Sequence, residues 1–112
     1  MTELALGDLV IYPERQEVLR LGQKIRLRRK EYALLEFLAR NRERVLNRLT
    51  ILEYVWNYGA QIATNTLEAH MSGLRRKIDR GFNKKLIHTF HGTGYMLSEN
   101  GPEKEHRLKS KD

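Results

Sequence analysis

The stretch from Thr64 to Asp79 carries polar and basic side chains at a spacing that could gather them against a second molecule. Four apolar residues recur in it at i, i+4, i+7 and i+11, one stripe of a helix with 3.6 residues per turn. This stripe is Leu67, Met71, Leu74 and Ile78. The opposite face is Asn65, Ala69, Ser72, Gly73 and Arg76, with Glu68 and Arg75 along one edge and Thr66 and His70 along the other. Small residues permit close approach and arginine attracts anions, so this face suits a polyanionic surface; a solvated amphipathic helix is the alternative.

The ends of this stretch have the residues of helix termini. Thr64 or Asn65 can serve as the N-cap, and Glu68 follows Asn65 by three residues, the spacing of a capping box. An acid in the first turn also suits the helix dipole. The sequence therefore predicts a helix from Thr64 to Asp79.

Basic residues are concentrated in and after this predicted helix. The chain has a formal net charge of +7, and between His70 and His91 six lysines and arginines stand against one acid, Asp79. From Val45 to Ala69 there is one basic residue, Arg48, and two acids. Such a local excess attracts phosphates, because binding releases their counterions.

Composition excludes several classes of protein. With 112 residues, 40% of them hydrophobic and 31% charged, the chain is sized for one globular domain with a real core. It has no cysteine, which excludes disulfides, thiolate metal sites and cysteine catalysis. No apolar run approaches the roughly 20 residues of a membrane span, and the N-terminus shows no signal-peptide pattern.

We find no arrangement of residues that predicts catalysis or metal binding. The histidines are His70, His88, His91 and His106, at spacings that match no ligand pattern. The Gly92-Thr93-Gly94 run lacks the helix and lysine of a phosphate-binding loop, so a hairpin turn is the better interpretation. With no catalytic triad, paired acids or cofactor motif, we expect neither an enzyme nor a cofactor.

Short strands are predicted at the N-terminus and two helices after them. The apolar runs that predict strands are Leu4–Leu6, Leu9–Ile11, Val18–Leu19 and Ile25–Leu27. The first helix should run from Arg29 to Arg40, with Lys30, Glu31, Glu36 and Arg40 facing water. The second should run from Arg48 to Trp56, with Asn47 as its N-cap.

The C-terminal part predicts a hairpin and a tail. Leu86 to Phe90 and Tyr95 to Leu97 flank the Gly-rich turn, the pattern of a β-hairpin. Strands, three helices and a hairpin in this order indicate an α+β winged helix-turn-helix, with an N-terminal four-stranded antiparallel sheet and a C-terminal β-hairpin wing. Residues 1–98 should form this domain. Residues 99–112, polar and containing Gly101-Pro102, should form a flexible C-terminal tail.

Nearly the whole chain resembles one family, the winged-helix effector domain of OmpR/PhoB-type response regulators. The matching segments are LRRKEYALLEFL (27–38), RVLNRLTILEYVW (44–56), NTLEAHMSGLRRKI (65–78) and LIHTFHGTGYML (86–97). The resemblance implies a cytoplasmic bacterial transcription regulator of a two-component system that binds double-stranded DNA. A receiver domain, phosphorylated by a sensor kinase, would precede it in the full-length protein. The family usually binds direct repeats as tandem dimers, and the isolated domain should be a monomer or a weak dimer.

The resemblance also implies roles for individual residues. Base edges would be read by Glu68 and Ala69, with Glu68 accepting from a cytosine amino group and Ala69 touching a thymine methyl. Phosphates would be contacted by Trp56, Asn65, Thr66, His70, Ser72, Arg75, Thr89 and Tyr95, and Thr93 at the wing turn belongs with the DNA-binding set. A loop that contacts RNA polymerase would consist of Asn57, Tyr58, Gly59, Ala60, Gln61, Ile62 and Ala63.

Two positions depart from the family's pattern. Gly73 stands where relatives often carry a base-reading arginine, and it costs about 1 kcal/mol relative to alanine inside a helix. Close approach of its backbone to DNA is one compensation to look for, and Arg76 or Ser72 could take over the reading. His91 stands where relatives often place an arginine that enters the minor groove.

The competing function is a winged helix that binds protein, such as RNA polymerase, or RNA. The outer face of the helix from Thr64 to Asp79 has no exposed aromatic residue for stacking on RNA bases. It also lacks an apolar stripe for a protein partner. Both observations favour duplex DNA.

Overall fold

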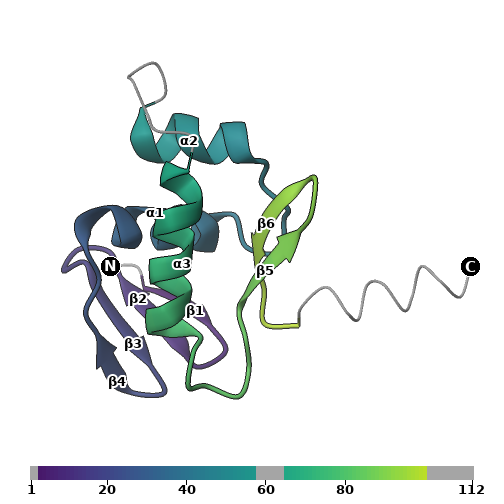
Figure 1. Ribbon diagram of the computed structural model, residues 1–112. Coiled ribbons are helices and arrows are strands. Elements are labelled where there is room, and N and C mark those ends of the chain that lie inside the picture. The colour runs from purple at the N-terminus through teal and green to yellow at the C-terminus, as the bar shows by residue number, and fades with distance from the viewer. Residues whose placement is uncertain (1–2, 58–64, 101–112) are drawn as a thin grey trace, which may run out of the picture.

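The computed structural model describes residues 3–57 and 65–100. Its elements are β1 (Leu4–Leu6), β2 (Leu9–Tyr12), β3 (Glu17–Arg20), β4 (Gln23–Ile25), α1 (Arg29–Arg40), α2 (Arg48–Trp56), α3 (Thr66–Ile78), β5 (Ile87–Phe90) and β6 (Gly94–Leu97). Figure 1 shows α3 in front of α1, with the four-stranded sheet to one side and the hairpin of β5 and β6 to the other. The predicted winged-helix architecture is confirmed.

The N-terminal strands form one antiparallel sheet in the order β1-β2-β3-β4. The last strand differs from the prediction, because it runs from Gln23 to Ile25 and not from Ile25 to Leu27. Arg20 pairs directly with Gln23, and the two residues between them, Leu21 and Gly22, both have positive φ, 53° and 74°. A two-residue turn of this kind matches the twist of its strands, so β4 begins at Gln23, two residues before the predicted start at Ile25.

The first two helices have the predicted bounds, and α3 begins at Thr66. The side chain of Asn47 caps α2 by accepting a hydrogen bond from the Thr50 amide at 2.8 Å. Asn65 is the N-cap of α3, but its side chain makes no capping bond, because its backbone (ψ 15°) lies outside the extended region that N-caps adopt. Thr64, the alternative cap, lies outside the described residues.

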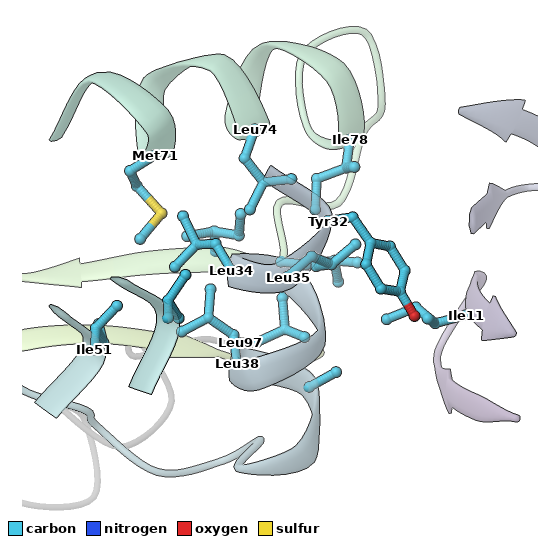
Figure 2. Close-up of a cluster of buried hydrophobic side chains, with 14 of the residues drawn as sticks. Ile11, Tyr32, Leu34, Leu35, Leu38, Ile51, Met71, Leu74, Ile78 and Leu97 are labelled. Carbon is cyan, nitrogen blue, oxygen red and sulfur yellow. The ribbon is translucent and has the colours of Figure 1, made fainter. Parts of the chain in front are cut away.

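The core forms where α3 crosses α1. The stripe of Leu67, Met71, Leu74 and Ile78 is fully buried, as its spacing predicted. In Figure 2 the labelled side chains of α3 point toward Leu34 and Leu35 of α1, and Leu97 of β6 and Ile51 of α2 belong to the same cluster. The apolar face of α3 is therefore buried in the core, and the exposed side chains of this helix lie on the side away from it.

The hairpin is anchored to the helices by a third short segment. Leu46 exchanges two backbone hydrogen bonds with Tyr95, at 2.8 and 3.0 Å. Gly94 lies against this segment so closely that a Cβ there would overlap the Leu46 carbonyl oxygen. Glycine at position 94 is therefore required by the approach of the Leu46 backbone, beyond its place in the turn.

Candidate nucleic-acid interface

A groove of about 680 Å³ lies between α3 and the hairpin of β5 and β6, which we call the wing. Its basic lining residues are Arg75, Arg76, Arg80 and Lys85, and His91 closes it from the turn of the wing. The acids on its lining are Glu68 and Asp79, and both are engaged in ion pairs with arginines from other elements. Four of the six lysines and arginines that lie between His70 and His91 in the sequence therefore line one groove between two elements.

Arg75 ties α3 to the wing. Its Nη2 donates to the hydroxyl of Thr89 and, at 3.4 Å, to the carbonyl oxygen of Ile87. Its guanidinium carbon also lies 5.6 Å from the centre of the Tyr95 ring. Arg75, Thr89 and Tyr95 were all predicted to contact phosphates, and the structure brings them together. Because a guanidinium has five N–H donors, Arg75 can hold the wing and still donate to a phosphate.

Glu68, the predicted base reader, is paired with Arg48 at the first turn of α2. The Arg48 Nε lies 2.7 Å from Oε2 of Glu68, and Nη2 lies 3.3 Å from Oε1. This two-point hydrogen bond holds the pKa of Glu68 below its ordinary value. Sequence reasoning did not assign Arg48 a role. Its isolation as the one basic residue between Val45 and Ala69 was the available signal, because two acids in that stretch compete for it.

A second hollow, of about 330 Å³, lies beside this ion pair. It is bounded by Arg48 and Glu68 on the helical side and by the turn of the wing, residues 89–95, on the other. His91 and Thr93 are exposed at this turn. Arg48 therefore belongs to the same surface as the predicted DNA-binding residues of the wing.

A group of aromatic and polar side chains lies where the end of α2 meets the start of α3. Trp56 and His70 make an edge-to-face contact with ring centres 5.0 Å apart. The Nδ1 of His70 lies 2.8 Å from the carbonyl oxygen of Thr66, so this ring nitrogen carries the proton. Trp56, Thr66 and His70, all predicted to contact phosphates, are therefore neighbours on one surface, while Asn65 beside them is exposed.

Gly73 does not lie on the outer face of α3, which corrects the prediction from helical spacing. It is buried, and a Cβ at this position would stand 2.5 Å from Oε2 of Glu31 in α1. Glu31, predicted to face water, is also buried, with 4% of its surface exposed. The compensation for glycine in this helix is therefore the close approach of Glu31, and Gly73 lies against α1 rather than on the exposed side of α3.

The carboxylate of Glu31 joins the two helices. Its Oε1 accepts from the backbone amide of Arg28, at 2.9 Å, and from Nζ of Lys77, at 2.6 Å. Burial alone raises the pKa of Glu31, but the hydrogen bonds from Lys77 and Arg28 outweigh it, so its pKa lies below the ordinary value. The first turn of α1 is thus capped by a residue that also fixes the flank of α3.

The remaining predicted residues of α3 stand on its exposed side. Glu68, Ala69, Ser72 and Arg76 are all exposed. Of the predicted polymerase-contact loop, Asn57 is described and has a left-handed backbone (φ 54°), and 58–63 lie outside the described residues.

Among residues 3–57 and 65–100, no group of three or more histidine and acidic side chains could hold a metal ion. None of the helices in that part of the chain is long and apolar enough to cross a bilayer.

Comparison with known proteins places this arrangement in a family. Residues 22–97 match the family model described as "Transcriptional regulatory protein, C terminal". The response regulator MprA of Mycobacterium avium is 42% identical over 99 residues, which cover 88% of this chain and 43% of MprA. The chain spans less than half of the length of the curated relatives it matches.

Solved structures agree with the family match. The DNA-binding domain of CpxR from E. coli superposes with a TM-score of 0.75 at 31% identity, covering 88% of this chain and 99% of that one. The response regulator DrrB of Thermotoga maritima, an OmpR/PhoB homologue, gives a TM-score of 0.76 at 29% identity over 86% of this chain and 44% of DrrB. This chain therefore belongs to the family of C-terminal domains of OmpR/PhoB-type transcriptional regulatory proteins.

Proposed function

We propose that this chain is the sequence-specific, double-stranded DNA-binding output domain of a two-component response regulator. α3 enters the major groove, and the wing lies on the adjacent backbone and minor groove. The observation that carries the proposal is the basic groove between α3 and the wing, in which Arg75 of α3 donates hydrogen bonds to Ile87 and Thr89 of the wing. A row of cations between two protruding elements matches the phosphate backbone that runs between the two grooves of a duplex.

Base reading is proposed for the exposed side of the first turns of α3. Ala69 presents a methyl group that suits the C5-methyl of thymine. Glu68 can accept from a cytosine amino group while paired with Arg48, because a carboxylate has about four acceptor sites and Arg48 uses two. With Gly73 turned toward α1, Arg76 and Ser72 are the further candidates on the exposed side.

Phosphate contacts are proposed at three places around this helix. Arg75, Thr89 and Tyr95 serve the groove, and Trp56, Asn65, Thr66 and His70 serve the end of α3 nearest α2. Ser72 and Thr93 lie on the exposed rim, and Arg48 is added because it bounds the hollow at the wing turn. His91 faces both hollows and is proposed to approach the minor groove. These contacts fix position on the duplex and carry little sequence information.

The full-length protein is proposed to be cytoplasmic, with a receiver domain and a partner sensor kinase. It would bind direct repeats as a tandem dimer, with the isolated domain a monomer or weak dimer. RNA polymerase is a further proposed partner, through the loop from Asn57 to Ala63. The length of the curated relatives, more than twice the matched part, supports a further domain.

The test is selection of bound fragments from a random pool of duplex DNA, followed by titration at low and high salt. We expect a motif of half-sites in direct repeat and an affinity that falls steeply with salt. Salt-dependent binding without a motif would refute sequence reading by the isolated domain. Failure to bind any duplex would refute the proposal and favour a protein or RNA partner.

A further inference from the structure

Arg20, the last residue of β3, is buried with none of its surface exposed. Its Nε donates to Oδ1 of Asp8 at 2.5 Å, within the N-terminal sheet region. Its Nη1 donates to the carbonyl oxygen of Ile78, the last residue of α3, and to Oδ1 of Asp79 at 3.3 Å. Its Nη2 donates to the carbonyl oxygen of Lys84 at 2.6 Å. One side chain therefore contacts the sheet, the end of α3 and the segment that leads to the wing.

Asp79 continues this connection into the wing. It is the C-cap of α3, with 5% of its surface exposed. Its Oδ1 accepts from the amide of Leu86 at 3.0 Å, and its Oδ2 accepts from the amide of Ile87 at 3.1 Å. The same carboxylate thus binds Arg20, the residue before β5 and the first residue of β5. The ring of Phe82, in the intervening segment, packs under the guanidinium with 4.5 Å between the ring centre and Cζ.

The energetics of this cluster favour a role in orienting the elements around it over a role in stabilising the fold. A fully buried guanidinium is costly to desolvate, and replacing a buried ion pair by apolar residues of similar size often leaves stability unchanged or raises it. The guanidinium instead fixes the relative positions of its acceptors, because its N–H donors lie in one rigid plane and bind several acceptors at once. Here those acceptors are the exit of α3 and the entry to the wing.

We propose that Arg20 and Asp79 are positioning residues for DNA binding, which set the angle between α3 and the wing so that both reach the same duplex. The inference rests on the proposed function. Both side chains are too buried to contact bases, so they act through α3 and the wing. Two contacts in one rigid body bind more tightly than two loosely joined ones, because the second contact pays no further ordering cost.

The first test is a double-mutant cycle in the full chain, with Arg20→Met as one change and the wing-tip pair His91→Ala and Thr93→Ala as the other. On the selected duplex, or on generic duplex if no motif is found, Arg20→Met should weaken binding roughly tenfold when the wing is intact. In the wing-tip background the same change should weaken binding clearly less than tenfold, because the proposed contacts of His91 and Thr93 are gone and only those of Thr89 and Tyr95 remain to be aligned with α3. Equal losses in the two backgrounds would overturn the inference.

Arg15→Met is the matched control, because it removes the same charge from an exposed arginine beside the same sheet, ion-paired with Glu17. An equal loss from Arg15→Met would mean that net charge alone is responsible. If Arg20→Met does not fold, Asp79→Asn replaces it in the cycle. That change keeps the size of the side chain. It replaces the oxygen that accepts from the Ile87 amide by an NH2 group, which cannot accept this hydrogen bond.

The second test does not depend on DNA. The chain has no cysteine, so Ser72→Cys and Thr93→Cys introduce two unique sites for spin labels on α3 and the wing. Arg20→Met should broaden the distance distribution between the labels, and Arg15→Met should not. An unbroadened distribution in Arg20→Met would overturn the inference even if the wild type binds DNA. Absence of DNA binding by the wild type with a broadened distribution would instead count against the proposed function.

Discussion

Replacing Gly73 by alanine should lower the stability of this domain, although alanine is the better helix former. The change gains about 1 kcal/mol of helix propensity. It also places a Cβ 2.5 Å from Oε2 of Glu31, which must retreat by at least about 0.5 Å to reach even the shortest tolerated separation, 3.0 Å. That carboxylate is held by Lys77 at 2.6 Å and by the Arg28 amide at 2.9 Å.

The size of the effect follows from these contacts. Loss of one charge-assisted hydrogen bond at a buried carboxylate costs about 1.5–3 kcal/mol. Set against the propensity gain, Gly73→Ala should destabilise the wild type by roughly 1 kcal/mol. In a Glu31→Ala background the obstruction is gone, and the next group, the guanidinium of Arg76, lies at an ordinary 3.7 Å. There the same change should stabilise by about 1 kcal/mol.

The assay is urea unfolding of the four proteins of this cycle, each extrapolated to zero denaturant. Ala69→Gly is the control, because Ala69 is exposed on the same helix and reports the propensity difference alone. The expected result is a reversal of sign between the two backgrounds. If Gly73→Ala stabilises the wild type as much as it stabilises the Glu31→Ala variant, the carboxylate yields freely and the reasoning is refuted.

Four further predictions concern single residues. Arg75→Ala should reduce the slope of log affinity against log salt by about 1 on any duplex, and an unchanged slope in a salt titration would argue against a phosphate contact. Glu68→Ala should relax preference at one base position by about 1–3 kcal/mol in a competition assay, and a preserved preference would remove it from the readers. His91→Arg should tighten binding to sites with A·T-rich flanks more than to others, and equal affinities would mean that the wing turn does not enter the minor groove. Because the folded-state pKa of Glu31 is lowered, its contribution is complete above about 4.5 and lost as pH falls through the lower value; acid unfolding curves should therefore show less pH dependence below 4.5 in Glu31→Gln than in the wild type.

The sequence by itself determined the elements and the direction in which α3 faces. An apolar stripe of 3.6-residue period requires one buried side, and Leu67, Met71, Leu74 and Ile78 all became core. Strand positions followed from alternation and turn residues, apart from β4, where the twist of a two-residue turn decided the register. The outward position of Glu68, Ala69, Ser72 and Arg76 followed from the same period.

The tertiary structure alone decided which residues at the edges of that face remain available. Helical periodicity gives the direction of each side chain, but it does not say how much of the helix surface a neighbouring element covers. Here α1 covers the flank that includes Gly73. The ion pairs that position the candidate site join residues far apart in the chain: Lys77 with Glu31, 46 residues away, and Arg20 with Asp79, 59 residues away. The sequence does not show which acid pairs with a given arginine or lysine, because many acids in the chain could be its partner. Only the packing of the sheet and helices brought these partners within hydrogen-bonding distance.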